Sequence, residues 1–374
     1  MTLPGRPLRV AMLAPIAWRV PPRHYGPWER VVSLLTEELV RQGAQVTLFA
    51  TADSLTAAAL SATAPHGYEE RPDASGAGPD GAALDVKVEE ALHLGSLFRQ
   101  AGQFDVIHNH ADFLPLSYAA LVGTPMLTTI HGFSGPGILP AYRAAPAGTF
   151  VSISDSDRHP DLTYAATIHH GLDLSELTFN PRGGPHLIFF GRMHPDKGAA
   201  DAIRIARAAG RRLLLAGIIQ DHAYFEQEVR PHLGADVQYL GSVGPAERDR
   251  LLGGALALLH PIHFDEPFGL SMTEAMACGT PVIAYRRGSV PEVVGADGGY
   301  VIPEGNEAAA VRAVHAAVTF DRSGARARVE RLFTARRMAR QYLREYHRLL
   351  DRLADTQGSR PAAPRQLTRP QVTS

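Results

Sequence analysis

Short apolar runs alternate with amphipathic helical stretches along most of the chain. The runs are four to six residues long and nearly continuous in Val, Ile, Leu and Phe, which is typical of parallel strands covered on both faces. The pattern predicts strands at 9–13, 45–50, 105–108, 126–130 and 150–153, and again at 186–190, 212–216, 237–240, 257–260 and 281–285. It predicts helices at 28–42, 197–209, 224–233 and 306–319.

Strand and helix alternate in two successive series, so we predict the α/β class with two doubly wound, Rossmann-like domains that face a central cleft. The stretch 180–185 separates the series because Asn-Pro-Arg-Gly-Gly-Pro is rich in breakers. We therefore expect an N-terminal domain over 1–180 and a C-terminal domain over 181–335. Segment 72–81 predicts a mobile surface loop, and 357–374, with three prolines, predicts a disordered tail.

Composition excludes several classes of protein. A chain of 374 residues with 45% hydrophobic and 20% charged positions can bury the cores of two domains. Its 37 basic and 38 acidic residues give a net charge of −1, which excludes a globally basic nucleic-acid-binding protein. No run approaches the roughly 18 apolar residues of a membrane-spanning helix. The apolar start at 8–18 is interpreted as a buried strand because Pro15 interrupts it and no cleavage pattern follows convincingly.

Cys278 is the only cysteine. A single cysteine excludes an internal disulfide framework and a multi-cysteine metal site, and it fits a reducing, cytoplasmic setting. We interpret Cys278 as a small apolar residue at a helix end.

Only two of the 37 basic residues are lysines, Lys87 and Lys197. Lys197 follows Arg192 by five positions in the segment 191–198, between a predicted strand and a predicted helix. Two cations beside a helix amino terminus form an anion site, since Arg grips phosphate oxygens in pairs and Lys acts as a point charge. A cation needed only for solubility would have been Arg in this chain. We therefore favour a phosphate role for Lys197 over a solvated turn, and interpret Lys87 as a surface residue.

Two carboxylates flank a predicted helix entrance in the segment 264–281. Glu266 lies in the loop and Glu274 about one turn into the helix, so they can accept hydrogen bonds from two separate sets of hydroxyls. A ligand rich in hydroxyls that also carries a diphosphate is a nucleotide sugar. The backbone N–H groups expected to bind its phosphates lie near Phe268, Gly269 and Leu270.

These blocks resemble the retaining glycosyltransferases of family four (glycosyl transferases group 1), which have the GT-B fold. Residues 266–274 look like the family's E-x7-E motif, and 275–284 are similar to its continuation. Gly191-Arg192 with Lys197-Gly198, and Gly-Ser-Val-Pro-Glu-Val at 288–293, also match. The resemblance covers nearly the whole chain in motif order.

The resemblance implies a role for each matched residue of the second half. Arg192 and Lys197 would bind the donor diphosphate. Glu266 would bind hydroxyls of the donor sugar near the reacting carbon, and Glu274 the ribose hydroxyls. Val243 belongs to a segment similar to the loop that contacts the nucleotide base.

The first half matches the family's glycine-rich loop, usually written G-G-x-E. Gly26 and Glu29 fit this pattern, but Pro27 replaces the second glycine and removes an N–H. A proline in the first turn suits a helix, yet it puts in doubt any ligand contact made by that amide in relatives. Trp28 is either a residue that stacks on an acceptor or a core residue of the helix, and we favour the core.

Histidines form the other candidate features of the first half. His131 in Thr-Thr-Ile-His-Gly matches the family's cleft histidine, for which the resemblance implies a contact to the donor sugar. The segment 108–112, His-Asn-His-Ala-Asp, is compatible with a metal site, but it lacks a further ligand pattern, so we favour a loop that faces the acceptor. Segments 152–156 and 169–173 resemble family blocks, with His170 at the usual Asn position.

Residues 321–352 contain ten arginines and four acids. The resemblance implies that the last helix, about 336–355, crosses back and completes the first domain. A basic helix can contact an anionic membrane surface, but a solvated face in an Arg-rich protein is the interpretation that we favour.

The expected function is the retaining transfer of a hexosyl unit from a nucleoside diphosphate sugar to an acceptor hydroxyl, giving an α-glycoside. We expect UDP as the nucleotide, with GDP and ADP as alternatives, and a small-molecule, saccharide or lipid-linked acceptor. The expected catalytic residues are His131, Glu266, Arg192 and Lys197, with no metal and no cofactor. The alternatives are a GT-B sugar-nucleotide epimerase and a non-catalytic nucleotide-sugar-binding scaffold.

Overall fold

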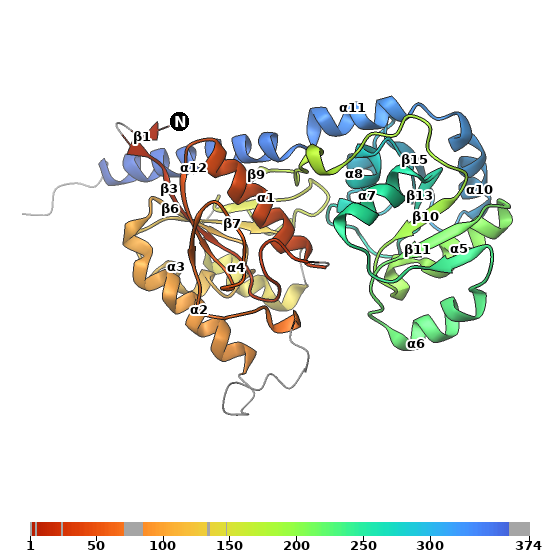
Figure 1. Ribbon diagram of the computed structural model, residues 1–374. Coiled ribbons are helices and arrows are strands. Elements are labelled where there is room, and N and C mark those ends of the chain that lie inside the picture. Colours follow the sequence, from red (N-terminus) through yellow and green to blue (C-terminus); the bar gives the residue numbers. More distant parts are fainter. Residues whose placement is uncertain are drawn as a thin grey trace, which may run out of the picture.

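The computed structural model describes residues 2–3, 6–23, 25–70, 85–132, 135–146 and 148–358. The loop predicted at 72–81 and most of the tail predicted at 357–374 lie outside these ranges. Two α/β units lie side by side, and a long helix extends from the second along the first (Figure 1).

The first unit is built on a seven-stranded parallel sheet with strand order β5-β4-β3-β6-β7-β8-β9. Its central strands are buried because their side chains are apolar on both faces. A short antiparallel ribbon of β1 (Thr2–Leu3) and β2 (Arg6–Pro7) precedes it. The strands are β3 (Arg9–Leu13), β4 (Gln45–Phe49), β5 (Ala59–Ser61), β6 (Val106–Asn109), β7 (Met126–Ile130), β8 (Phe150–Ser152) and β9 (Tyr164–Thr167). The helices are α1 (Pro27–Arg41), α2 (Val86–Gln100), α3 (Leu116–Ala119) and α4 (Leu139–Ala144).

The second unit has a six-stranded parallel sheet with order β12-β11-β10-β13-β14-β15. Numbered from its own first strand, this is the doubly wound order 3-2-1-4-5-6. The strands are β10 (Leu187–Phe190), β11 (Leu213–Ala216), β12 (Val237–Tyr239), β13 (Ala257–His260), β14 (Val282–Tyr285) and β15 (Gly299–Ile302). The helices are α5 (Ala199–Ala208), α6 (His222–Tyr224), α7 (Pro245–Gly253), α8 (Leu270–Ala277), α9 (Val290–Val294), α10 (Glu307–Ala316) and α11 (Arg322–Leu332).

The predicted α/β class and parallel sheets are confirmed, and all ten predicted strands are present to within one residue at each end. Five strands were not predicted: β1 and β2 of the short ribbon, and β5, β9 and β15, each of which lies at the edge of a parallel sheet. Edge strands are partly exposed, so they lack the continuous apolar run that marks the central ones. The helix predicted at 224–233 is present as a continuous helical segment over 222–232, in which α6 passes into a π-helical stretch at Phe225–Val229 and a final 3₁₀ turn at Arg230–His232 that contains Pro231.

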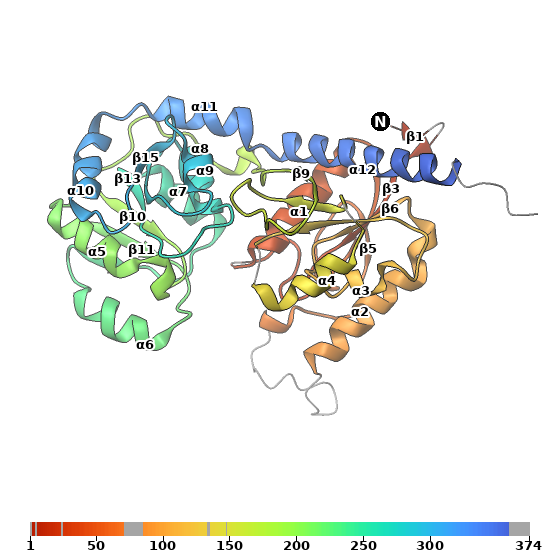
Figure 2. The same ribbon diagram turned by 180° about the vertical axis from the view of Figure 1, so that it is seen from behind.

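The last helix, α12 (Ala335–Gly358), packs on the first unit. Its apolar face enters the core formed by β3, β4 and α1, where Tyr342 and Tyr346 are fully buried. Both views show it as the blue helix running beside α1 and β9 (Figures 1 and 2). Arg336, Arg340 and Arg344 lie on its exposed side. Among the described residues, no helix is both long enough and apolar enough to cross a membrane.

Candidate active site

A cavity of about 340 Å³ lies between the two units, at the carboxyl ends of their parallel strands. Loops after β7, β10, β11 and β13 reach it, as expected for the ligand edge of an open parallel sheet. This cavity is lined by all ten residues that we predicted for binding or catalysis: Gly26, His131, Arg192, Lys197, Val243, Glu266, Phe268, Gly269, Leu270 and Glu274.

An ion pair between Lys197 and Glu266 occupies the wall formed by the second unit. Lys197 Nζ lies 2.7 Å from Glu266 Oε2 and 4.3 Å from the centre of the Phe264 ring. Burial alone would raise the pKa of Glu266, but Lys197 and His260 outweigh that effect and lower the pKa to about 2. Glu266 is therefore a buried anion. His260 Nε2 lies 3.3 Å from the same carboxylate oxygen and helps to hold it.

Two glycines allow the backbone to pack closely in this wall. Gly198, with φ 74°, connects Lys197 to α5, and a Cβ there would lie 1.9 Å from the carbonyl oxygen of Pro261. Gly269, with φ 83°, is the N-cap of α8 and offers no side chain to its first amides. Both positions need glycine because they combine a positive φ with close packing. As a result, Lys197 and the amino end of α8 face the same cavity.

Arginines surround Glu274, the second carboxylate of this wall. Arg248 Nη1 lies 3.4 Å and Arg30 Nε 3.8 Å from Glu274 Oε1. Arg30 comes from α1 of the first unit, so this cluster joins the two units at the cavity. Arg192 lines the cavity and makes no ion pair within the described part of the chain, which leaves its charge available to a ligand.

Aromatic rings form the opposite wall. The ring of Trp28 stacks on that of His131, with centroids 5.2 Å apart and planes inclined by 19°. His170 also contacts the His131 ring, at 5.1 Å. Trp28 is only partly buried and lines the cavity, so the core role that we favoured for it is wrong. Its place at the start of α1, beside the cleft, explains the difference.

The histidines of segment 108–112 lie behind this wall. His108 and His110 are fully buried and are absent from the cavity lining, so the acceptor-facing loop expected for them is wrong. His110 Nδ1 lies 2.8 Å from His131 Nε2, and the other edge of His110 contacts His108. Burial lowers the pKa of all three well below the usual histidine value. Within the described ranges, no group of three or more His, Cys, Asp or Glu side chains is arranged to hold a metal ion.

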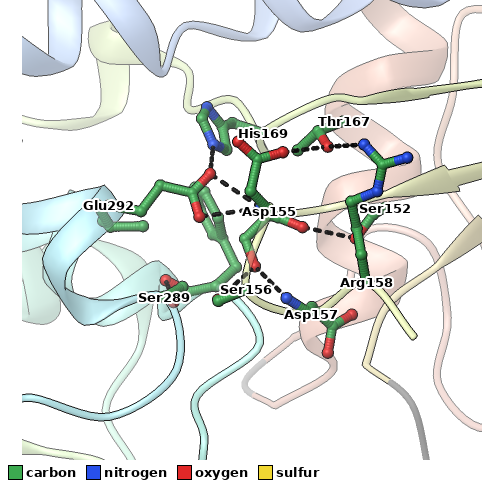
Figure 3. Close-up of polar contacts among 12 residues, drawn as sticks. Ser152, Asp155, Ser156, Asp157, Arg158, Thr167, His169, Ser289 and Glu292 are labelled. Carbon is green, nitrogen blue, oxygen red and sulfur yellow. Dashed lines mark hydrogen bonds and ion pairs between the residues drawn. The ribbon is translucent and has the colours of Figure 1, made fainter. Parts of the chain in front are cut away.

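A second polar contact joins the units at the side of the cleft (Figure 3). Glu292 of α9 accepts hydrogen bonds from the backbone N–H of Asp155, at 2.9 and 3.1 Å, and its Oε1 lies 2.5 Å from His169 Nε2. Burial opposes ionisation, but His169 and these amides lower the pKa of Glu292. The Glu292 carboxylate of the second unit thus accepts hydrogen bonds from the turn that follows β8 of the first unit.

Sequence reasoning missed two charged residues of the cavity. Arg30 lies one position after Glu29 of the glycine-rich loop pattern, and Arg248 lies in α7. In a chain with 35 arginines, neither stood out from the composition. Only the fold reveals their shared partner, Glu274.

Comparison with known proteins identifies the family in both halves of the chain. Residues 28–158 match the model described as Glycosyltransferase Family 4, and residues 177–329 match the one described as Glycosyl transferases group 1.

Two curated relatives share part of the chain. Glycogen synthase of Mycobacterium tuberculosis is 31% identical over 225 residues, which are 51% of this chain and 54% of the relative. The phosphatidyl-myo-inositol mannosyltransferase of Propionibacterium freudenreichii is 30% identical over 261 residues, 62% of this chain and 66% of the relative. The chain thus spans about half to two thirds of the curated relatives it matches.

Solved structures share the whole architecture. A glycosyltransferase involved in avilamycin A biosynthesis aligns with a TM-score of 0.69 at 25% identity, covering 92% of this chain and 98% of that one. The Anabaena protein HepE, solved in complex with UDP and glucose, aligns with a TM-score of 0.63 at 17% identity over 94% and 100%. With both halves matched in order and the architecture shared throughout, the chain belongs to the glycosyl transferases group 1 of glycosyltransferase family four, with the GT-B fold.

Proposed function

We propose that this protein is a retaining glycosyltransferase that moves a hexosyl unit from a nucleoside diphosphate sugar to an acceptor hydroxyl. The observation that carries the proposal is the content of the cavity between the units. Arg192, Lys197 and the uncapped amino end of α8 face the space that also holds Glu266 and Glu274. Cations and free amides suit a diphosphate, and carboxylates suit the hydroxyls of a sugar and a ribose.

Charge stabilisation is the main contribution that the chain would make to the reaction. The bond between the anomeric carbon and the diphosphate oxygen breaks, and negative charge grows on the diphosphate. Arg192, Lys197 and the amides of α8 would stabilise that charge more strongly in the transition state than in the bound donor. The acceptor oxygen bonds to the same face of the anomeric carbon, and its proton passes to the leaving diphosphate. This front-side path yields an α-glycoside from an α-linked donor.

Glu266 would act as a binding carboxylate in this scheme. Its bond to Lys197 shows that the free site neutralises its own charge. A diphosphate would draw Lys197 toward itself and leave Glu266 free to accept hydrogen bonds from donor hydroxyls. Because fixed cations take the place of a metal, we propose that the reaction needs no metal ion, and chelation by EDTA should leave the rate unchanged.

UDP is the nucleotide that we propose, with GDP and ADP as alternatives. HepE, which shares the fold, was solved with UDP and glucose, and the base would lie near Val243 and Ile218 at the end of the cavity formed by the second unit. A thermal-shift panel of UDP, GDP, ADP and their sugars tests this choice, because a ligand of the native state raises the unfolding temperature.

Product analysis tests the reaction class. Incubation with the donor that gives the largest thermal shift, together with a panel of acceptors, should yield a glycoside whose anomeric proton shows the donor's configuration by NMR. An altered nucleotide sugar without any acceptor would establish an epimerase instead. Nucleotide binding without either hydrolysis or transfer would establish a scaffold.

A further inference from the structure

The first unit forms its side of the cavity almost entirely from uncharged side chains. Nine of the described residues that line the cavity belong to this unit, and Arg30 is the only one among them with a permanently charged side chain. All other charged side chains of the described lining come from the second unit. Six of the nine residues carry rings: Pro22, Tyr25, Pro27, Trp28, His131 and His170.

The two histidines of this side add no positive charge. Burial lowers the pKa of His170 to about 3 and that of His131 well below the usual value, so both rings are neutral at physiological pH. A phosphate placed against them would lose its water and gain no compensating charge. Burial of an anion without a partner is costly, so these rings disfavour a phosphate beside them.

Arg30 already has partners that occupy its charge. Its Nη2 lies 2.5 Å from Glu176 Oε2, and its Nε lies 3.8 Å from Glu274 Oε1. A phosphate of the acceptor would have to compete with two carboxylates for one guanidinium, and both carboxylates would repel it. Among the described residues on the first unit's side, an anionic group therefore meets no free cation.

Trp28 offers an aromatic surface on the same side. One face of its ring stacks on His131, with centroids 5.2 Å apart. The side chain is only partly buried and lines the cavity. The surface that it presents to a ligand is therefore the other face and the edge of the indole.

This stack of rings is supported from behind by the core of the first unit. His131 Nε2 lies 2.8 Å from His110 Nδ1, and the ring of His110 packs on that of His108 with centroids 4.0 Å apart. His108 Nδ1 in turn lies 2.6 Å from Tyr346 Oη of α12. His108, His110 and Tyr346 are fully buried. A ligand would thus meet an aromatic surface that is formed in advance, which lowers the entropic cost of binding.

An uncharged sugar ring fits these properties. One face of a pyranose consists largely of C–H groups, and its hydroxyls project to the sides. Tryptophan provides a large, rigid contact surface for such a group at low cost in conformational entropy. Neutral neighbours suit hydroxyls, which need no opposite charge.

We propose that Trp28 forms the floor of a subsite for an uncharged sugar ring of the acceptor, and that the part of the acceptor inside the cavity carries no phosphate. Trp28 belongs to α1 of the first unit, whereas the charged groups assigned to the donor all belong to the second. Naming this sugar as the acceptor rests on the proposed function. The subsite and its preference for uncharged sugars do not.

Fluorescence of Trp28 tests the subsite directly. The chain has two tryptophans, and Trp18 is absent from the described lining of the cavity. Trp18→Phe therefore leaves Trp28 as the single emitter and keeps an aromatic ring beside Tyr25. Glucose, mannose and maltose, each added with and without UDP, should shift or quench its emission. Glucose 6-phosphate, mannose 6-phosphate and maltose 1-phosphate should require at least about tenfold higher concentrations, since each brings an uncompensated charge.

Both parts of the proposal can fail in this titration. No response to any of the uncharged sugars would overturn the subsite. Responses to the phosphates at equal or lower concentrations would overturn the exclusion of phosphate from the cavity.

Variants of Trp28 separate an acceptor sugar from a donor sugar. By calorimetry, Trp28→Ala should weaken the tightest of the uncharged sugars by about tenfold, and Trp28→Phe by less, because phenylalanine keeps an aromatic face. Binding of UDP and of UDP-glucose should stay as in the wild type. Tyr118→Ala, which removes a partly exposed ring outside the described lining, is the matched control.

The outcomes of this series are distinct. Unchanged sugar affinity in Trp28→Ala would overturn the role of Trp28 as the floor. A greater loss for UDP-glucose than for UDP would place the donor sugar on this ring and overturn the acceptor assignment. Sugar binding as expected without any transfer would reject the proposed function alone. Transfer that favours a phosphorylated sugar over its uncharged counterpart would reject the subsite and leave the proposed function standing.

Discussion

Both walls of the cleft bury polar side chains beside the ligand space, but the two walls differ in the charge of those side chains. The wall of the second unit keeps its charges and pairs them, as in Lys197 with Glu266. The wall of the first unit keeps its titratable rings neutral and links them, as in His131 with His110. A charged wall suits a ligand that brings charge, and a neutral wall suits one that brings hydroxyls. Under the proposed function, the wall of the second unit would bind the diphosphate and the wall of the first unit would face the sugar or the acceptor.

Acidification should lower the stability of the folded protein through the neutral histidines of the first unit's wall. This is the largest effect that we expect. Burial lowers the pKa of His170 to about 3, and that of His108, His110 and His131 well below the usual value. The unfolded chain takes up these protons near pH 6.5 and the folded chain does not, so stability is present above that pH and falls below it. Each ring removes up to about 1.4 kcal/mol per pH unit.

Urea denaturation between about pH 7 and pH 5 measures this loss less the opposing effect of Glu29, whose pKa burial raises to about 7, so that its contribution to stability grows as the pH falls. A free energy of unfolding that stays constant over that range would contradict the prediction that these histidines are neutral in the folded protein. Glu266 serves as the control, because its lowered pKa contributes stability that is present above 4.5 and is lost only as the pH falls toward about 2. Glu266→Gln should leave the slope above pH 5 unchanged.

Removal of the cation from the charged wall should have the next largest effect. Lys197→Ala is expected to lower turnover at saturating donor by about 10²–10³-fold, because it removes one preorganised group that stabilises growing charge. The matched control is Lys87→Ala, which changes the other lysine of the chain on the exposed surface of α2. Equal turnover of Lys197→Ala and wild type would remove Lys197 from the mechanism.

Glu274→Gln tests the nucleoside end of the charged wall. The change should weaken UDP binding by about tenfold to a hundredfold, since hydrogen bonds to a charged group contribute about 1.5–3 kcal/mol. Inorganic diphosphate, which has no ribose, should bind the variant as tightly as the wild type. A parallel loss for both ligands in calorimetry would show that Glu274 acts only through Arg30 and Arg248.

The smallest effect concerns the contact that joins the two units beside the cleft. Glu292→Gln removes the charge from the pair with His169, which is partly exposed, so we expect a loss of about 1 kcal/mol or less. Small-angle scattering should show a wider spread of separations between the units. Glu307→Gln, which changes a surface ion pair with Arg204, is the matched control. Indistinguishable scattering profiles would show that the contact does not set their arrangement.

The residues of the charged wall could be predicted because they lie close together in the sequence. Arg192 and Lys197 lie within one loop, and Glu266 and Glu274 within one loop and the helix after it. A strand, a loop with special glycines and a helix amino end can each be predicted from short stretches of residues.

The neutral wall was not predictable in the same way, because its bonds join distant parts of the chain. Tyr346 and His108 are 238 positions apart, and Thr129 and Tyr342 are 213 apart. Segment 108–112 showed that histidines were concentrated there, but not that they turn inward toward α12. The edge strands were not predicted because they are partly exposed and therefore lack a continuous run of apolar residues.

Placement of α12 also determines the order in which the chain can fold during synthesis. One core of the second unit lies wholly between Leu187 and Ala317, so it can form once that stretch has left the ribosome. The main core of the first unit begins at Leu8 and includes residues of α12 up to Leu349. Contacts of such long separation carry a large loop-closure cost and form late. The unit that is synthesised first is therefore completed last, and its unfinished apolar face is the surface that a chaperone would have to protect.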